Sequence, residues 1–217
     1  MAKIEHVQIY GLAETIFRSG YPLRKEAPTE QEFLQEVAEI NTALAAGDKE
    51  NIHIKRAIKL ANAKGGGHDQ FLSGILVNFD MTLTNKAWVE AERYRFLTFI
   101  SSMSTMHRVA FFKIGACCSP HTSKDAVAAA EAMQQAYHDI DGTAQPERKK
   151  EAYLDLLMSL PAGFEVMAGM TTNYRCLRNI YEQRRRHKLP DWHVVCDWIE
   201  SLPLAEDLLV PALGIGR

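Results

Sequence analysis

Apolar and polar residues alternate most regularly in the segment ILVNFDMTL, residues 75–83. The odd-numbered positions are all apolar, whereas Asn78, Asp80 and Thr82 stand between them. A period of two is typical of a strand with one face on the core. We therefore predict a strand here, and the opening segment KIEHVQIYGLAETI indicates another strand that runs into a helix.

Helical spacing of apolar residues dominates the rest of the chain. Thr29 with Glu32 three residues later is the pattern of a capping box, and the helix that it begins continues to Gly47. A second helix follows and stops at the glycines 65–67. Further helices are predicted over residues 85–100, 123–140, 151–161, 171–186 and 191–204.

These elements predict an α+β fold in which helices pack on a small, mostly antiparallel sheet. The segment 101–108, SSMSTMHR, is rich in hydroxyl groups and is interpreted as a loop or a fraying helix end. Neither a repeat nor a convincing linker divides the chain. We therefore expect a single domain over residues 1–217.

Two arginines fall on predicted apolar stripes. Arg184 is in line with Leu177 and Ile180, and Arg93 lies on the stripe of the helix predicted over 85–100. A guanidinium that leaves water needs an anion or a planar acceptor, because an unpaired buried charge is prohibitive. Its fork of donors matches phosphate oxygens or the carbonyl edge of a base. The pattern indicates that Arg184 holds a ligand.

The alternative interpretation is that both arginines are solvated. Residues 184–188, RRRHK, are cationic and stand at a helix C-terminus, where positive charge complements the helix dipole. Arg93 has Glu90 and Glu92 close by and can extend past the aromatic residues to water. Periodicity alone does not decide between the two interpretations.

Composition and charge narrow the classes of function. The 217 residues carry a formal net charge of −2, which argues against binding to nucleic acid or to a membrane surface through bulk charge. A small anion such as a nucleotide phosphate fits. Neither a signal peptide nor a membrane span is evident. The four cysteines include an adjacent pair and no C-x-x-C spacing, so we expect a reducing, cytoplasmic setting and no metal.

Taken together, the motifs resemble those of the flavin-dependent thymidylate synthases, the ThyX family. The resemblance covers about Ile58 to Trp198 and rests on GGGHDQF, on ILVNFDMTL, on RYRFLTFISSMST and on TTNYRCLRNIYEQR. They are similar to the family's glycine-histidine turn, strand, R-H-R motif and T-x-N-x-R-x-L-x-N helix. The last motif agrees at five polar positions in register.

The resemblance implies roles for individual residues. The positions similar to cofactor-contacting residues of the family are His68, Arg93, Arg95, Asn173, Arg175 and Asn179. The positions implied to contact the substrate are Arg93, Ser101, Ser102, Ser104 and Arg184. Arg184 is similar to the arginine that binds the pyrimidine ring and polarises it for attack at carbon 5.

The sequence also departs from the family's pattern. Tyr94 replaces the central histidine of R-H-R, and the asparagine-glutamate pair that follows in the family is absent. Leu157 stands where the family has another phosphate-binding arginine, and Glu90 where a glutamine contacts the nucleotide. Most of these losses concern substrate recognition. They favour a flavoprotein with an altered substrate over a standard dTMP producer.

The implied function is flavin-dependent C5 alkylation of a pyrimidine deoxynucleotide, dUMP or dCMP. The implied cofactor is FAD, with NADPH and methylenetetrahydrofolate as co-substrates and a methyl or hydroxymethyl group as the one transferred. The implied assembly is a homotetramer whose sites are shared between chains. Two alternatives stay open: a non-catalytic homologue that binds flavin or nucleotide, and a helical interaction module without a ligand.

Overall fold

The computed structural model describes residues 2–63 and 67–210. The strands are β1 (Lys3–Tyr10), β2 (Leu76–Thr84), β3 (Thr98–Ser102) and β4 (Glu165–Asn173). The α-helices are α1 (Leu12–Arg18), α2 (Glu30–Ala46), α3 (Ile52–Ala61), α4 (Asn85–Ala91), α5 (Thr105–Arg108), α6 (Lys124–Asp139), α7 (Pro146–Met158), α8 (Tyr174–Arg184), α9 (Pro190–Glu200) and α10 (Ala205–Leu208). The 3-10 helices are η1 (Tyr21–Leu23), η2 (His68–Gly74), η3 (Val109–Phe111) and η4 (Ile114–Cys117).

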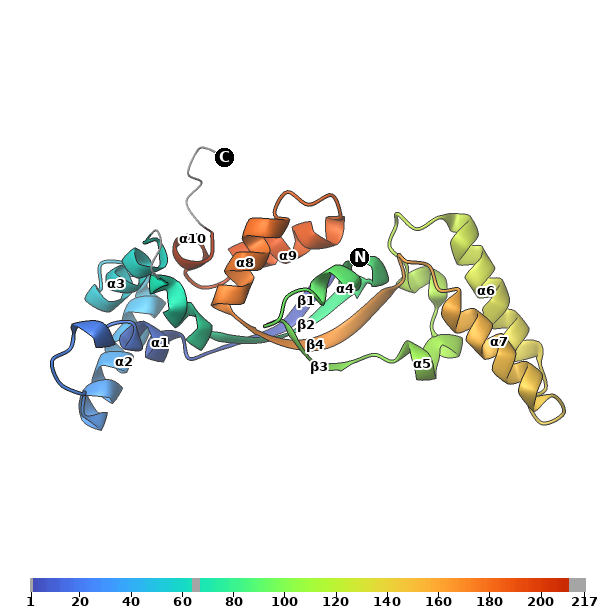
Figure 1. The fold of residues 1–217 in the computed structure, drawn as a ribbon, viewed down its shortest axis with the longest axis horizontal. Coiled ribbons are helices and arrows are strands. Elements are labelled where there is room, and N and C mark those ends of the chain that lie inside the picture. The colour runs from blue at the N-terminus through green and yellow to red at the C-terminus, as the bar shows by residue number, and fades with distance from the viewer. Residues whose placement is uncertain (1, 64–66, 211–217) are drawn as a thin grey trace.

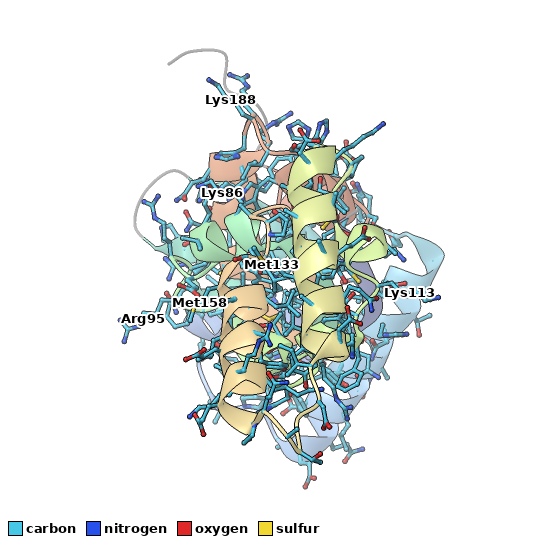
Figure 2. The ribbon with its side chains drawn as sticks, turned by 90° about the vertical axis from the view of Figure 1, so that its right-hand side faces the viewer. Lys86, Arg95, Lys113, Met133, Met158 and Lys188 are labelled. Atoms are coloured by element: carbon cyan, nitrogen blue, oxygen red, sulfur yellow. The ribbon has the colours of Figure 1, made fainter. Side chains whose placement is uncertain are left out.

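The molecule is elongated, with the sheet at its centre (Figure 1). Helices α1, α2 and α3 form one end, α5, α6 and α7 form the other, and α4, α8 and α9 lie on the sheet between them. Each end has its own cluster of buried apolar side chains, and a larger cluster lies between the sheet and its helices. Figure 2 looks at the second end, where α6 and α7 run side by side.

The sheet is antiparallel throughout, in the order β1-β2-β4-β3. The alternation in β2 decides which face is buried: Val77, Phe79 and Met81 are at most 3% exposed, whereas Asn78 and Asp80 on the other face are half-buried. The ring centroid of Phe79 lies 4.6 Å from that of Trp198 in α9. The predicted α+β fold with a small antiparallel sheet is therefore confirmed.

Several predicted elements are confirmed with small changes of boundary. The Thr29–Glu32 capping box is present, and Gly47 ends α2 in the left-handed conformation, with φ of 67°. The strand predicted over 75–83 is β2, and the opening strand and helix are β1 and α1. Helix α3 ends at Ala61, before the three glycines predicted to stop it, of which Gly65 and Gly66 lie outside the described residues.

The prediction of a single helix over residues 85–100 is wrong beyond Ala91. Helix α4 ends at Ala91, a turn follows in which the Leu97 amide donates to the Tyr94 carbonyl, and Thr98 begins β3. Residues 98–100 are threonine, phenylalanine and isoleucine, which fit a pleated surface better than a helix. Arg93 therefore lies in an exposed turn and not on a buried helical stripe.

The helix predicted over 171–186 begins three residues later than expected. Residues 171–173 are the end of β4, a strand that the sequence pattern did not indicate. This strand is central, between β2 and β3, so its partners on both sides satisfy its backbone. The consequence for the site is that β4 runs directly into α8.

Candidate functional site

A pocket of about 620 Å³ lies beside the first half of α8. Its walls come from η2, from the turn after α4 and from the exposed face of α8. The residues that line it are Asp69, Gln70, Ser73, Arg93, Tyr94, Arg95, Phe96, Asn173, Arg175, Cys176, Arg178, Asn179 and Glu182. This volume is in the range of small-molecule sites in proteins.

The transition from β4 to α8 positions the helix side of the pocket. Asn173 is the last residue of β4 and the N-cap of α8, and its side-chain oxygen accepts a hydrogen bond from the Cys176 amide at 2.9 Å. Because α8 starts at that point, Arg175 and Asn179, four residues apart, project from the same face into the pocket. The helix start is thus fixed by a residue that itself lines the pocket.

Arg175 faces η2 across the pocket. One guanidinium nitrogen donates to the Gln70 side-chain oxygen at 2.5 Å, and another lies 3.4 Å from an oxygen of Asp69. The Arg175 side chain is still 43% exposed. It is therefore held in place by polar neighbours without being closed off from a ligand.

Arg93 and Arg95 come from the turn after α4 and are both exposed. Neither guanidinium forms an ion pair with any residue that the structure describes. Figure 2 shows Arg95 extending outward at the edge of the molecule. The pocket wall carries four arginines, Arg93, Arg95, Arg175 and Arg178, against two carboxylates, Asp69 and Glu182. This excess of positive charge favours an anionic ligand.

Arg184 has a different environment from the one the periodicity suggested. It is only 7% exposed, as its place on the apolar stripe indicates, but it does not line the pocket. Its Nη1 donates to Glu90 Oε2 at 2.9 Å and its Nε donates to the Tyr94 hydroxyl at 2.8 Å. The guanidinium also lies 4.7 Å from the ring centroid of Trp192. In this structure Glu90 of the same chain neutralises the charge, and a role of Arg184 toward a ligand stays a prediction.

Glu90 is the centre of this buried cluster. Besides Arg184, the Trp192 indole donates to it at 3.0 Å, His187 Nε2 lies 3.3 Å away and Lys86 Nζ lies 3.5 Å away. Burial is the largest influence on the carboxyl and opposes its charge. The indole hydrogen bond and the neighbouring cations together outweigh burial, so the pKa of Glu90 lies below its ordinary value of 4.5. The carboxylate is therefore charged at neutral pH.

A series of hydrogen bonds connects this cluster to the pocket wall. The Tyr94 hydroxyl, which accepts from Arg184, donates to Gln183 Oε1 at 3.1 Å. The Gln183 amide nitrogen donates to Asn179 Oδ1 at 2.8 Å. Burial raises the pKa of the Tyr94 hydroxyl, although the hydrogen bond from Arg184 opposes the rise. Tyr94 and Asn179 both line the pocket, so Arg184 reaches it only through them.

The remaining predicted residues lie outside the pocket wall. His68 is exposed and is the first residue of η2, directly before Asp69. Ser101 and Ser102 are exposed on β3, and the Ser104 hydroxyl accepts from the His107 amide as the N-cap of α5. The structure thus brings together Arg93, Arg95, Asn173, Arg175 and Asn179, and leaves His68, the three serines and Arg184 apart from them.

Sequence reasoning missed several residues of the pocket. Arg178 and Glu182 lie on the same helical face as Arg175 and Asn179, at spacings of three and four residues. That polar face was the signal that could have identified them. Gln70 belongs to the GGGHDQF segment, but no periodicity indicates that it contacts Arg175.

In residues 2–63 and 67–210, no helix combines the length and the apolar character that crossing a bilayer requires. The same residues contain no group of three or more His, Cys, Asp or Glu side chains placed to hold a metal ion.

Comparisons with known proteins support the fold through structure and not through sequence. No protein-family model matches the chain, and no curated protein sequence matches it significantly. Among solved structures, the chain is similar to thymidylate synthase X (ThyX) from Helicobacter pylori with FAD and dUMP. That match has a TM-score of 0.61 and 13% identity, and it covers 96% of this chain and 97% of that one.

A second structure of the flavin-dependent thymidylate synthase ThyX from Helicobacter pylori, complexed with FAD and dUMP, gives a TM-score of 0.59 at 14% identity. The coverage is again 96% of this chain and 97% of that one. Similarity over nearly the full length of both chains, at this low identity, establishes the architecture. The chain has the ThyX fold.

Proposed function

We propose that the pocket beside α8 binds a flavin, and that the protein uses FAD to alkylate carbon 5 of a pyrimidine deoxynucleotide, dUMP or dCMP. The observation that carries the proposal is the pocket itself. Four arginines and two asparagines line one cavity, in a fold whose solved Helicobacter pylori examples are described with FAD and dUMP. Five of the six residues that resemble cofactor-contacting positions line it.

The side chains of the pocket fit the chemical groups of FAD. A diphosphate needs cationic donors, and Arg93, Arg95 and Arg175 supply them from two sides of the cavity. A flavin ring needs amide partners for its carbonyl and nitrogen atoms, and Asn173 and Asn179 are placed on the wall. Asp69 and Gln70 hold Arg175 without neutralising the whole cluster.

Under this proposal the protein binds and orients, and the cofactor supplies the reactive chemistry. When bound, a flavin supplies the hydride and one-carbon transfer that side chains cannot perform. Arg175, Arg93 and Arg95 hold anionic groups, and Asn179 fixes the polar edge of the ring. NADPH as hydride source and methylenetetrahydrofolate as one-carbon donor belong to the proposal, with a methyl or hydroxymethyl product.

The substrate side of the proposal requires more than one chain. Ser101, Ser102 and Ser104, proposed to help bind the nucleotide phosphate, are carried by β3 and the segment after it and do not line the pocket of their own chain. The same region exposes large apolar side chains: Ile100 is 61% exposed, and Phe111 is 67% exposed. An exposed apolar region beside an edge strand fits a contact between chains. We propose a homotetramer in which these serines serve a neighbouring chain's pocket.

One observation favours a second candidate function, a homologue that binds flavin or nucleotide without catalysis. The proposed catalytic role of Arg184 is to stabilise negative charge on the pyrimidine. In this structure its guanidinium is instead paired with Glu90 and surrounded by Tyr94 and Trp192. Catalysis by Arg184 requires that the substrate draw it away from Glu90, whereas a binding protein leaves the pair intact.

The visible absorption spectrum of the purified protein tests the proposal, together with thermal shifts measured with FAD, FMN, dUMP and dCMP. We expect a flavin spectrum and a rise in melting temperature with FAD. Release of tritium from carbon 5 of labelled dUMP or dCMP, with methylenetetrahydrofolate and NADPH present, then separates an enzyme from a binding protein. Colourless protein whose melting temperature responds to none of these ligands would support an interaction module instead.

A further inference from the structure

A continuous series of hydrogen bonds connects Glu90 to Asn179 through three other side chains. Its steps are Arg184 to Glu90 at 2.9 Å, Arg184 to Tyr94 at 2.8 Å, Tyr94 to Gln183 at 3.1 Å and Gln183 to Asn179 at 2.8 Å. Side chains from α4, the turn after it and α8 take part. Because α4 and α8 are far apart in sequence, the series also ties two walls of the pocket together.

The directions of the bonds in the series are consistent with its first donor. A guanidinium can only donate, so the Tyr94 oxygen accepts from Arg184. Tyr94 then has one proton to give, and it goes to Gln183 Oε1. This fixes the Gln183 amide with its nitrogen toward Asn179 Oδ1. The hydrogen-bond partners thus assign an orientation to both side-chain amides.

The origin of the series is held rigidly. The Arg184 guanidinium is buried beside the Trp192 and Tyr94 rings, 4.7 and 5.6 Å from their centroids. Glu90 accepts a second hydrogen bond, from the Trp192 indole, which can only donate. In this pair Arg184 and the Trp192 indole are therefore always the donors and Glu90 is the acceptor.

From this geometry we infer that Asn179 presents its amide N–H donors, and not its carbonyl oxygen, to the pocket. Its Oδ1 already accepts a hydrogen bond from Gln183, whereas its Nδ2 has no hydrogen-bond acceptor among residues 2–63 and 67–210. The ligand atom that meets Asn179 is therefore a hydrogen-bond acceptor, such as a ring carbonyl oxygen or an unprotonated ring nitrogen. Arg184, Tyr94 and Gln183 are positioning residues. That the ligand is a flavin rests on the proposed function.

Variants of Asn179 and Gln183 test the inference through FAD affinity, measured by titration of flavin fluorescence. Asn179→Asp keeps the acceptor for Gln183 but removes both donors, and we expect FAD to bind about 10- to 100-fold more weakly. Gln183→Met frees the Asn179 amide to rotate, and we expect about 2- to 5-fold weaker binding. Gln135→Met is the matched control, because Gln135 makes the same kind of contact four residues along α6, with Asp139 at 2.8 Å.

Tyr94→Phe supplies a readout that does not depend on any ligand. It keeps the aromatic ring beside Arg184 and removes only the hydroxyl that orients Gln183. In NMR spectra of the protein without flavin, we expect the Gln183 side-chain amide protons to exchange faster with water in this variant. The Gln135 amide protons should be unchanged.

The outcomes separate the inference from the proposed function. If the wild-type protein binds no FAD but the Gln183 side-chain amide protons exchange faster in Tyr94→Phe, the proposed function is wrong. The inferred directions of the hydrogen bonds are then still supported. If FAD binds and Asn179→Asp binds it as well as the wild type does, the inferred donor is wrong. Unchanged Gln183 exchange in Tyr94→Phe would equally overturn the inference, whatever the flavin result.

Discussion

The two ends of α8 carry arginines with opposite surroundings. At the first turn, Arg175 is 43% exposed in its side chain, lines the pocket and meets neutral and acidic partners on η2. At the last turn, Arg184 is buried, is paired with Glu90 and lies behind the pocket wall. In this structure the same helix thus holds one arginine that is accessible to a ligand and one that is paired within the chain.

The difference shows how much can be concluded from an arginine that falls on a predicted apolar stripe. The apolar stripe correctly identified Arg184 as buried and in need of an anion, but a carboxylate of the same chain supplies that anion. Arg175 lies off the stripe and is accessible to a ligand. The pattern was correct about the burial of Arg184 and wrong about Arg93, and in neither case did it indicate function.

Removing Arg184 from its ion pair with Glu90 should have the largest effect on stability. Arg184→Met leaves Glu90 charged without its nearest cationic partner, and we expect a loss of about 3 kcal/mol or more in the free energy of unfolding. Urea denaturation followed by circular dichroism measures it. The double variant Glu90→Leu/Arg184→Met removes both charges and should recover most of the loss. A single variant as stable as the wild type would show that the pair is not structural.

Removing Arg175, at the accessible end of α8, should weaken FAD binding and leave stability nearly unchanged. Arg175→Ala removes a cationic donor from the pocket, and we expect FAD affinity to drop by about 10-fold or more, which corresponds to a charged hydrogen bond of about 1.5 to 3 kcal/mol. Isothermal titration calorimetry checks the affinity, and denaturation checks that stability changes little. Unaltered affinity in Arg175→Ala would remove this residue from the proposed site.

A smaller effect should appear in the pH dependence of stability. The pKa of Glu90 in the folded protein lies below 4.5, its value when unperturbed. Its contribution is therefore complete above that unfolded value and is lost as the pH falls through the folded value. Glu90→Gln should flatten the decline of stability on the acid side, as measured by urea midpoints between neutral pH and about pH 3. Parallel curves for both proteins would contradict the assignment.

The smallest effect is expected just beyond the helix. Arg186 is exposed and forms no ion pair with a described residue, so it represents the solvated arginine of the alternative interpretation. Arg186→Ala should change the free energy of unfolding by no more than about 0.5 kcal/mol and leave FAD affinity unchanged. A large change in either quantity would contradict the interpretation of Arg186 as a solvated arginine with no role in stability or binding.

The fold could be predicted where local signals were strong. The capping box of α2, the alternation of β2 and the amphipathic pattern of α9 each specify their element within a few residues. Strands β3 and β4 were missed because they are stabilised by pairing with each other and with β2, which local spacing does not record. In residues 85–100, apolar residues at helical intervals imitated a helix that ends at Ala91.

The site was predicted only as far as its residues fall in recognisable motifs. Arg93, Asn173, Arg175 and Asn179 were identified through motif positions, and the pocket brings them together. The partner of Arg184 could not be predicted, because Glu90 is 94 residues away along the chain. Only a folded structure shows that these two side chains meet.

A crystal structure of the protein with FAD would show directly which arginine of α8 contacts the flavin. We predict flavin in the pocket between η2 and the first half of α8, with Arg175 and Asn179 in contact with it and Arg184 still paired with Glu90. Flavin bound at another surface, or an Arg184 that has left Glu90 to contact the ligand, would contradict it.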